Sequence, residues 1–166
     1  MTVERPSRSV TIDAELIRGM TWDATVYTLT RPLAVLAYAA LIAAFVVNAI
    51  VLGMVAADES RAMTLTLTMF AIAALIVGSV AFTRASARRA ILAVMPSGST
   101  VRAEVGDESI TLASKRGVSD MRYATFRGVR VGRHAAILQL RSASVVTAVP
   151  RVLLSDADVA LLKSRI

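Results

Sequence analysis

Apolar and polar positions follow different patterns in the two halves of the chain. From Pro32 to Thr83 the chain is almost entirely apolar, whereas from Thr100 onward apolar and polar residues alternate. An apolar run of about 18 residues or more is typical of a membrane-spanning helix. Alternation with a period of two is typical of a β-strand with one buried face. The sequence therefore predicts an α+β membrane protein.

The apolar half divides into two segments that are each long enough to cross a bilayer. Pro32–Ala57 and Ala62–Thr83 contain no charged residue, and only the four residues Asp58–Arg61 separate them. About 20 apolar residues span the hydrocarbon core of a membrane. We therefore predict a transmembrane helical hairpin over residues 32–83, with its two helices at 32–57 and 62–83.

Two other interpretations of these segments fit the sequence less well. A cleaved signal peptide has an apolar region of about 7–15 residues close to the N-terminus, whereas 31 residues of mixed composition precede this longer run. A helical hairpin buried in a soluble protein would show a polar stripe along each helix. Neither segment shows such a stripe.

Polar and small residues inside the segments indicate how the helices pack. The polar residues are uncharged, so they give little support for an ion pathway; they are Tyr38, Asn48, Thr64, Thr66, Thr68 and Ser79. We expect the side chains of Asn48 and of the threonines to bond to a neighbouring helix or to their own backbone. Small residues four positions apart let helices approach closely. Two pairs have this spacing, and they are Ala49 with Gly53 and Ala74 with Gly78. We interpret them as packing positions within the hairpin, with dimerisation as the alternative.

The net charge of +7 is concentrated after the second apolar segment. Residues 84–166 carry +8, residues 1–31 are neutral, and residues 58–61 carry −1. Cytoplasmic flanks of membrane helices are enriched in Lys and Arg. The arginines that flank the segments are Arg31, Arg84, Arg88 and Arg89. They predict a multi-pass membrane protein with both termini in the cytoplasm.

Residues 1–31 predict a short strand followed by an amphipathic helix next to the membrane. Ser9–Asp13 is β-like, and Asp13 is a suitable N-cap for a helix with apolar residues at helical intervals. Amphipathic aromatic side chains settle at the level of the lipid headgroups. The predicted membrane-interface anchors are Trp22, Tyr27, Arg31 and Arg84. The alternative for Trp22 is packing against the C-terminal domain.

The remainder of the chain predicts a basic linker over residues 84–99 and a β-domain over residues 100–166. Six strands joined by short turns predict an antiparallel meander that ends at Pro150. Ser155 and Asp158 have the spacing of a capping box, which predicts a terminal helix covering the apolar face of the sheet. Ser9–Ile12 is a candidate seventh strand at the edge of this sheet.

Two stretches in this order of elements resemble the YcxB-like family of small bacterial membrane proteins. They are GDESITLASKRGVSDMRYATFRGVRV (residues 106–131) and VVTAVPRVLLSDADVALLKSRI (residues 145–166). In the second stretch, Pro150 and Arg151 precede the final helix, as in the family. Tyr123 and Phe126 stand where family members often carry Trp. The resemblance implies a C-terminal domain similar to pleckstrin-homology (PH) domains, and it implies no catalytic activity.

No arrangement of residues in the sequence indicates catalysis, a metal site or a cofactor. The chain has no cysteine, which excludes disulfides and thiol chemistry. His134, the only histidine, stands in VGRHA, where we expect a solvated side chain in a turn. Gly128–Gly132 lacks the strand-to-helix context of a phosphate-binding loop. We therefore predict that the protein is not an enzyme and binds no cofactor or metal.

Arginines are the remaining candidates for a binding function. Each Lys or Arg held near an anionic membrane surface contributes about 1 kcal/mol to membrane binding. We predict no binding of nucleic acid, because exposed aromatic side chains of the kind that stack on bases are missing among the arginines. The candidate contacts to anionic lipid are Arg88, Arg89, Arg122, Arg127, Arg130 and Arg133.

These features predict an inner-membrane protein with a cytoplasmic PH-like binding domain. Its expected role is that of a scaffold, a regulatory subunit or a sensor, with membrane lipid, a protein partner or a further copy of the chain as partner. The alternative is a small component of a transporter or channel, in which the hairpin oligomerises in the membrane. A charge within the apolar segments would favour that alternative, and the sequence has none there.

Overall fold

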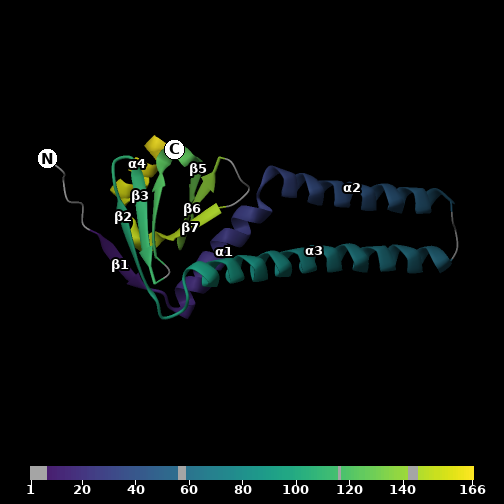
Figure 1. Ribbon diagram of the computed structural model, residues 1–166. Helices are drawn as coiled ribbons and strands as arrows, with labels where there is room; N and C mark the ends of the chain where they lie inside the picture. Colours follow the sequence, from purple (N-terminus) through teal and green to yellow (C-terminus); the bar gives the residue numbers. More distant parts are fainter. Residues whose placement is uncertain (1–6, 56–58, 116, 142–145) are drawn as a thin grey trace. The chain divides into compact units, whose positions relative to one another are not determined.

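The computed structural model describes residues 7–55, 59–115, 117–141 and 146–166, which form an α+β protein (Figure 1). The chain divides into two compact units. The first, here called the β-domain, comprises Met1–Ala24 and Ser86–Ile166, and the second, the helical hairpin, comprises Thr25–Ala85. The hairpin is therefore inserted in the sequence of the β-domain, between its first and second strands.

The first sheet of the β-domain joins strands from before and after the hairpin. Its four antiparallel strands are β1 (Arg8–Thr11), β2 (Thr100–Val105), β3 (Ser109–Ser114) and β4 (Gly117–Arg122), side by side in this order. Val10 of β1 lies opposite Val101 of β2. Just after β1, the amide of Ile12 donates to the carbonyl of Ser99 over 2.8 Å. The predicted seventh strand is confirmed as the partner of β2.

The last three strands form a separate antiparallel sheet, so the prediction of one continuous meander is wrong. These strands are β5 (Phe126–Val131), β6 (Ala135–Leu140) and β7 (Val146–Pro150). The first sheet ends at a 3-10 turn, η1 (Tyr123–Thr125). Buried Tyr123 holds this turn, because its amide donates to the Glu108 carbonyl (2.9 Å) and its hydroxyl to the Gly106 carbonyl (2.8 Å).

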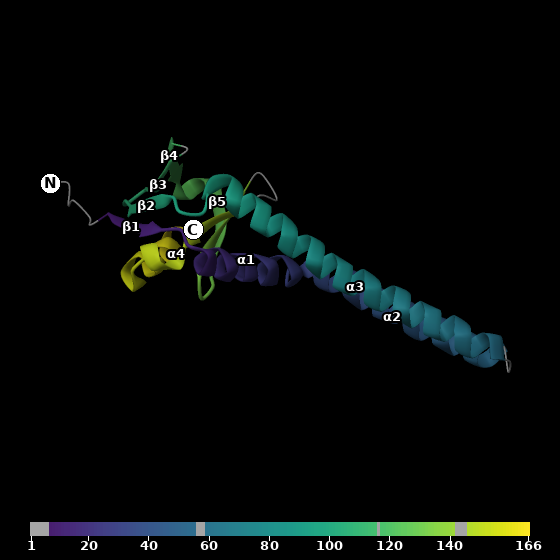
Figure 2. The same ribbon diagram turned by 90° about the horizontal axis from the view of Figure 1, so that it is seen from below.

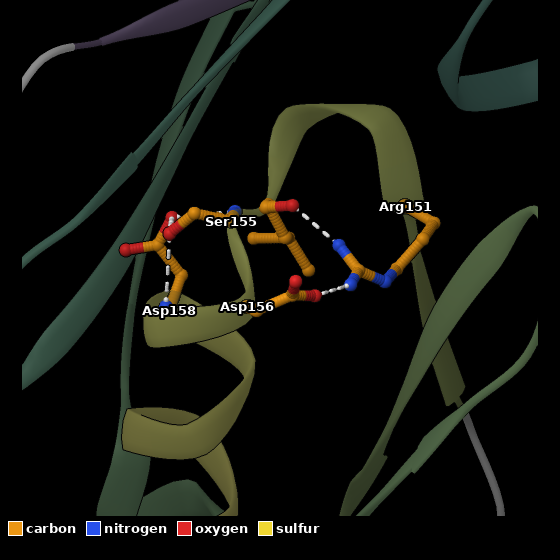
Figure 3. A network of polar contacts seen from close by, with 5 residues as sticks. Arg151, Ser155, Asp156 and Asp158 are labelled. Atoms are coloured by element: carbon orange, nitrogen blue, oxygen red, sulfur yellow. Dashed lines mark hydrogen bonds and ion pairs between the residues drawn. The ribbon is translucent and has the colours of Figure 1, made fainter.

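The C-terminal helix α4 (Asp156–Arg165) begins with the predicted capping box (Figure 3). Ser155 Oγ accepts a hydrogen bond from the amide of Asp158 (3.1 Å), and Asp158 Oδ2 accepts one from the amide of Ser155 (2.8 Å). In the 3-10 turn η2 (Arg151–Leu153), Arg151 donates to the Leu154 carbonyl and pairs with Asp156. These contacts fix the start of α4, which buries Leu162 completely.

The helix α1 (Ala14–Leu29) also begins as predicted, at Asp13. Asp13 Oδ1 accepts a hydrogen bond from the amide of Leu16 over 2.7 Å, which satisfies one of the free amides at the helix start. Ile17 and Met20 of α1 are buried in the core that both sheets and α4 share. This part of α1 therefore belongs to the β-domain.

Residues 84–99, which the sequence predicts as a linker, are helical as far as Val94. The helix α3 runs from Glu59 to Val94. Ile91 near its end and Met95 just after it are buried in the core of the β-domain. The β-domain therefore begins again at Ser86 and not at Thr100, because apolar residues of this stretch complete its core.

The long helices of the helical hairpin are α2 (Pro32–Val55) and the first part of α3, which lie side by side (Figures 1 and 2). These helices correspond to the predicted segments 32–57 and 62–83. The predicted turn differs, since Glu59–Arg61 already belong to α3. Residues 56–58, with Asp58 of the predicted turn, lie outside the described residues.

Candidate functional site

The surface of the helical hairpin is apolar on all sides. Two helices are long and apolar enough to cross a membrane, over Pro32–Val51 and Met63–Val94. In the described part of these helices, no residue of the most apolar window is buried. Large side chains such as Leu33 (81% exposed), Met54 (82%) and Phe82 (70%) point away from the hairpin. A soluble monomer rarely exposes an apolar surface of this extent.

One seam of half-buried side chains joins α2 to α3. On α2 these are Ala34, Tyr38, Leu41, Phe45 and Asn48, and on α3 they are Leu65, Thr68, Ile72, Ile76 and Ser79. Their spacing of three and four residues is that of packed helices. Across the seam, Tyr38 Oη lies 2.7 Å from Ser79 Oγ. The Thr68 hydroxyl donates to the Thr64 carbonyl (2.8 Å). The expectation that a threonine side chain bonds to its own backbone is confirmed for Thr68, whereas the contact between Tyr38 and Ser79 was not predicted.

The predicted small packing residues do not gather on this seam. Ala49 is half-buried, whereas Gly53, Ala74 and Gly78 are exposed. A Cβ added to Gly78 would meet no atom outside its own helix backbone within 4 Å. The two helices thus do not use Gly78 as a point of close approach. A role for these residues in packing against another chain stays a prediction.

The predicted interface anchors have different environments. Trp22 is 56% exposed, so it does not pack into the core of the β-domain, which was the alternative. Tyr27 is only 9% exposed, and the Arg31 guanidinium lies over its ring, with Cζ 4.8 Å from the ring centroid. Arg84 is exposed on α3. Contact of these side chains with lipid headgroups stays a prediction.

The six candidate lipid-binding arginines are exposed, but they do not form a single cluster. Arg88 and Arg89 lie on the last turns of α3, and Arg127 and Arg130 lie on β5. Arg122 precedes β5 and Arg133 follows it. Six residues of strand separate these two positions, a length of about 20 Å at 3.3 Å per residue. Arg122 and Arg133 therefore lie near opposite ends of β5.

A contact that the sequence does not indicate joins α1 to the β5–β6 turn, which comprises residues 132–134 (Figure 2). Asp23 Oδ2 accepts hydrogen bonds from the amides of His134 (2.6 Å) and Ala135 (2.9 Å). We call this contact the Asp23 clasp. It links residues 111 and 112 positions apart in the sequence, from before and after the hairpin.

Two glycines make the Asp23 clasp sterically possible. A Cβ at Gly132 would lie 2.6 Å from Asp23 Cγ, and a Cβ at Gly19 would lie 2.7 Å from His134 Nδ1. The expectation of a solvated His134 side chain is therefore wrong, because the half-buried imidazole packs against the backbone of α1 at Gly19. The only signals in the sequence are a glycine that interrupts an amphipathic helix and a glycine in a turn, and neither identifies the partner.

Comparisons with known proteins identify no relative of the chain. Within the described residues, no three or more His, Cys, Asp or Glu side chains are grouped so that they could hold a metal ion. No protein-family model matches the sequence, and neither a curated protein nor a solved structure matches the chain. The function is therefore inferred from the two apolar helices, the exposed arginines and the Asp23 clasp.

Proposed function

We propose that this chain is an integral protein of the bacterial cytoplasmic membrane that holds a PH-like binding domain at the inner membrane surface. The observation that carries the proposal is the apolar hairpin, whose helices expose apolar side chains on all sides. In a membrane the apolar chains of the lipids would surround these apolar side chains, and the helices satisfy their own backbone hydrogen bonds.

Both outer ends of the hairpin lie on the same side of the membrane. β1 precedes the hairpin and β2 follows it, yet the two strands pair, with Val10 opposite Val101. The Asp23 clasp adds a second link between these parts of the chain. A folded β-domain built from both parts needs an even number of membrane crossings. The basic residues after the second apolar segment favour the cytoplasmic side.

The β-domain acts in binding and not in catalysis. Its two antiparallel sheets and capped C-terminal helix support the resemblance to PH-like domains of the YcxB-like family. Its exposed arginines lie in a domain whose chain enters and leaves an apolar hairpin, so anionic lipid headgroups are the nearest oppositely charged partner. The protein thus serves as a scaffold, regulatory subunit or sensor at the membrane, and it recruits or responds to lipid or a protein partner.

Cysteine labelling tests this topology, because the natural chain contains no cysteine. We expect Glu59→Cys to react with a membrane-impermeant maleimide in intact spheroplasts, since it stands next to the connection between the two helices. Ser97→Cys, at an exposed position of the β-domain, should react only after lysis. Labelling of Ser97→Cys in intact spheroplasts would contradict the proposed orientation, and recovery of the protein in the soluble fraction would contradict membrane insertion.

A further inference from the structure

The exposure of Trp22 is unusual for the helix on which it lies. α1 buries Ile17, Met20 and Ala24, whereas Trp22 is 56% exposed. The side chain therefore contributes little to the core of the β-domain. Tryptophan combines a large apolar ring with a polar N–H, a combination favoured where water meets lipid. Arg18, also exposed, precedes Trp22 by four residues and so lies on the same face of α1.

The Asp23 clasp brings a second basic residue to this part of the domain. Trp22 is the neighbour of Asp23, and Arg133 is the neighbour of His134, whose amide donates to Asp23 (2.6 Å). Arg133 is exposed at the tip of the β5–β6 turn. Trp22 and Arg133 thus each stand one residue from the clasp, and Arg18 lies one helical turn before Trp22. We call Arg18, Trp22 and Arg133 the clasp corner.

We propose that the clasp corner is a headgroup site for anionic phospholipid, in which Trp22 lies at headgroup depth while Arg18 and Arg133 bind lipid phosphate. This inference rests on the proposed membrane insertion and narrows it to one part of the β-domain. The site is close to the apolar segment along the chain, because Pro32, the start of that segment, follows Trp22 by ten residues. The helical part of this stretch, from Trp22 to Leu29, is about 10 Å long.

Asp23 is a positioning residue of this site. Its carboxylate contacts the two amides of the turn and fixes the turn that carries Arg133. Arg122 is not part of the site, because it lies at the other end of β5, about 20 Å from the turn by strand length. Arg122 and Arg133 have the same charge and are both exposed, so they make a matched pair for an experiment.

The intrinsic fluorescence of the full chain in lipid nanodiscs reports on the site directly, because Trp22 is the only tryptophan. Nanodiscs would contain brominated phosphatidylcholine, with or without phosphatidylglycerol. We expect quenching of Trp22 that increases with phosphatidylglycerol and decreases in high salt, where exposed charges are screened. Trp22 emission that neither bromination nor phosphatidylglycerol changes would overturn the proposal. The maleimide labelling described above tests the insertion itself independently.

Variants then separate a defined site from diffuse charge attraction. Arg133→Ser should lower the ratio of lipid-contacting to detached Trp22 about fivefold, the equivalent of the roughly 1 kcal/mol of one arginine near an anionic surface. Arg133→Lys should restore the ratio, and Arg122→Ser should leave it unchanged. Equal effects of Arg133→Ser and Arg122→Ser would overturn the site and leave the wider proposal of membrane binding standing.

A last variant tests the positioning role of Asp23. Asp23→Ala removes the clasp and should weaken the dependence of Trp22 quenching on phosphatidylglycerol as much as Arg133→Ser does. Circular dichroism of the same sample would show whether the β-domain remains folded. A folded Asp23→Ala protein with unchanged quenching would contradict the role of the clasp, and the Arg133 variants still test the site if this protein unfolds.

Discussion

Phe126 in the β-domain is fully buried, whereas Phe82 in the helical hairpin is 70% exposed. The two side chains are chemically identical, and each is typical of its region. In the β-domain apolar residues alternate with polar ones and point into a shared core, as on β2. In the hairpin they cover both helices without a polar face. The difference supports the proposal of two solvents, water around the β-domain and lipid around the hairpin.

The largest expected effect comes from truncating the buried member of this pair. Phe126→Ala should destabilise the β-domain by about 3–5 kcal/mol, because it removes a fully buried ring and leaves a cavity. Phe82→Ala should leave the stability of the β-domain unchanged. Thermal unfolding in nanodiscs, followed by near-UV circular dichroism, measures both. Similar losses in the two variants would show that the regions do not differ as described.

A charge introduced into the hairpin tests the same comparison, now by a change in the apolar helices and not in the β-domain. Leu75→Arg places a cation in the middle of the apolar segment of α3, which costs about 2.5–3.5 kcal/mol at the centre of a membrane helix. Val118→Arg, on β4, is the matched control, because Val118 is 72% exposed and exposed substitutions in water change stability by only about 0.5 kcal/mol. The yield of each variant in the membrane fraction measures how well that variant inserts. If Leu75→Arg is tolerated as well as Val118→Arg, lipid does not surround α3.

A pair of glycines sharpens the contrast between close packing and open surface. Gly132→Ala should destabilise the β-domain by about 1–3 kcal/mol, because the new Cβ collides with Asp23 of the clasp. Gly78→Ala should not destabilise a single chain, since its Cβ meets open space. Unfolding midpoints of the two variants test this pair. A Gly78→Ala variant with weakened self-association would instead show that Gly78 packs against a second copy.

The smallest effect is expected at the start of α4. Ser155→Ala removes the acceptor for the Asp158 amide, and loss of an N-cap costs about 1 kcal/mol. Ser164→Ala is the control, because Ser164 is exposed and its hydroxyl bonds only to the Leu161 carbonyl of the same helix. Urea unfolding of the β-domain should give a lower free energy of unfolding for Ser155→Ala than for Ser164→Ala. Equal stability of both variants would mean that the capping box does not hold α4.

Features that depend on neighbours in sequence could be predicted, and features that depend on distant contacts could not. The strands β2 and β3, the Asp13 cap and the Ser155–Asp158 capping box all follow from local spacing. The division into two sheets depends on Tyr123 bonding to the Gly106 carbonyl, 17 residues away. Local alternation contains no information on that bond.

The candidate site shows the same limit. The six arginines could be named from charge alone, but charge does not show that Arg122 and Arg133 lie at opposite ends of β5. The Asp23 clasp joins residues more than 100 positions apart. Asp23 is one of several acidic residues before the hairpin, so the sequence does not distinguish its role from that of the others. The sequence predicts a linker over residues 84–99 because the arginines there are more conspicuous than Ile91, which the structure buries.

The central claim is that one β-domain is assembled from segments before and after a membrane hairpin. Amide hydrogen exchange of the full chain in nanodiscs tests it most directly, at Ile12, whose amide donates to the Ser99 carbonyl across the two segments (2.8 Å). We expect the Ile12 amide to exchange as slowly as that of buried Leu112 in β3, a strand that pairs with β2 and β4 and not with β1. Exchange of Ile12 at the rate of an unfolded peptide, with Leu112 still protected, would contradict the account.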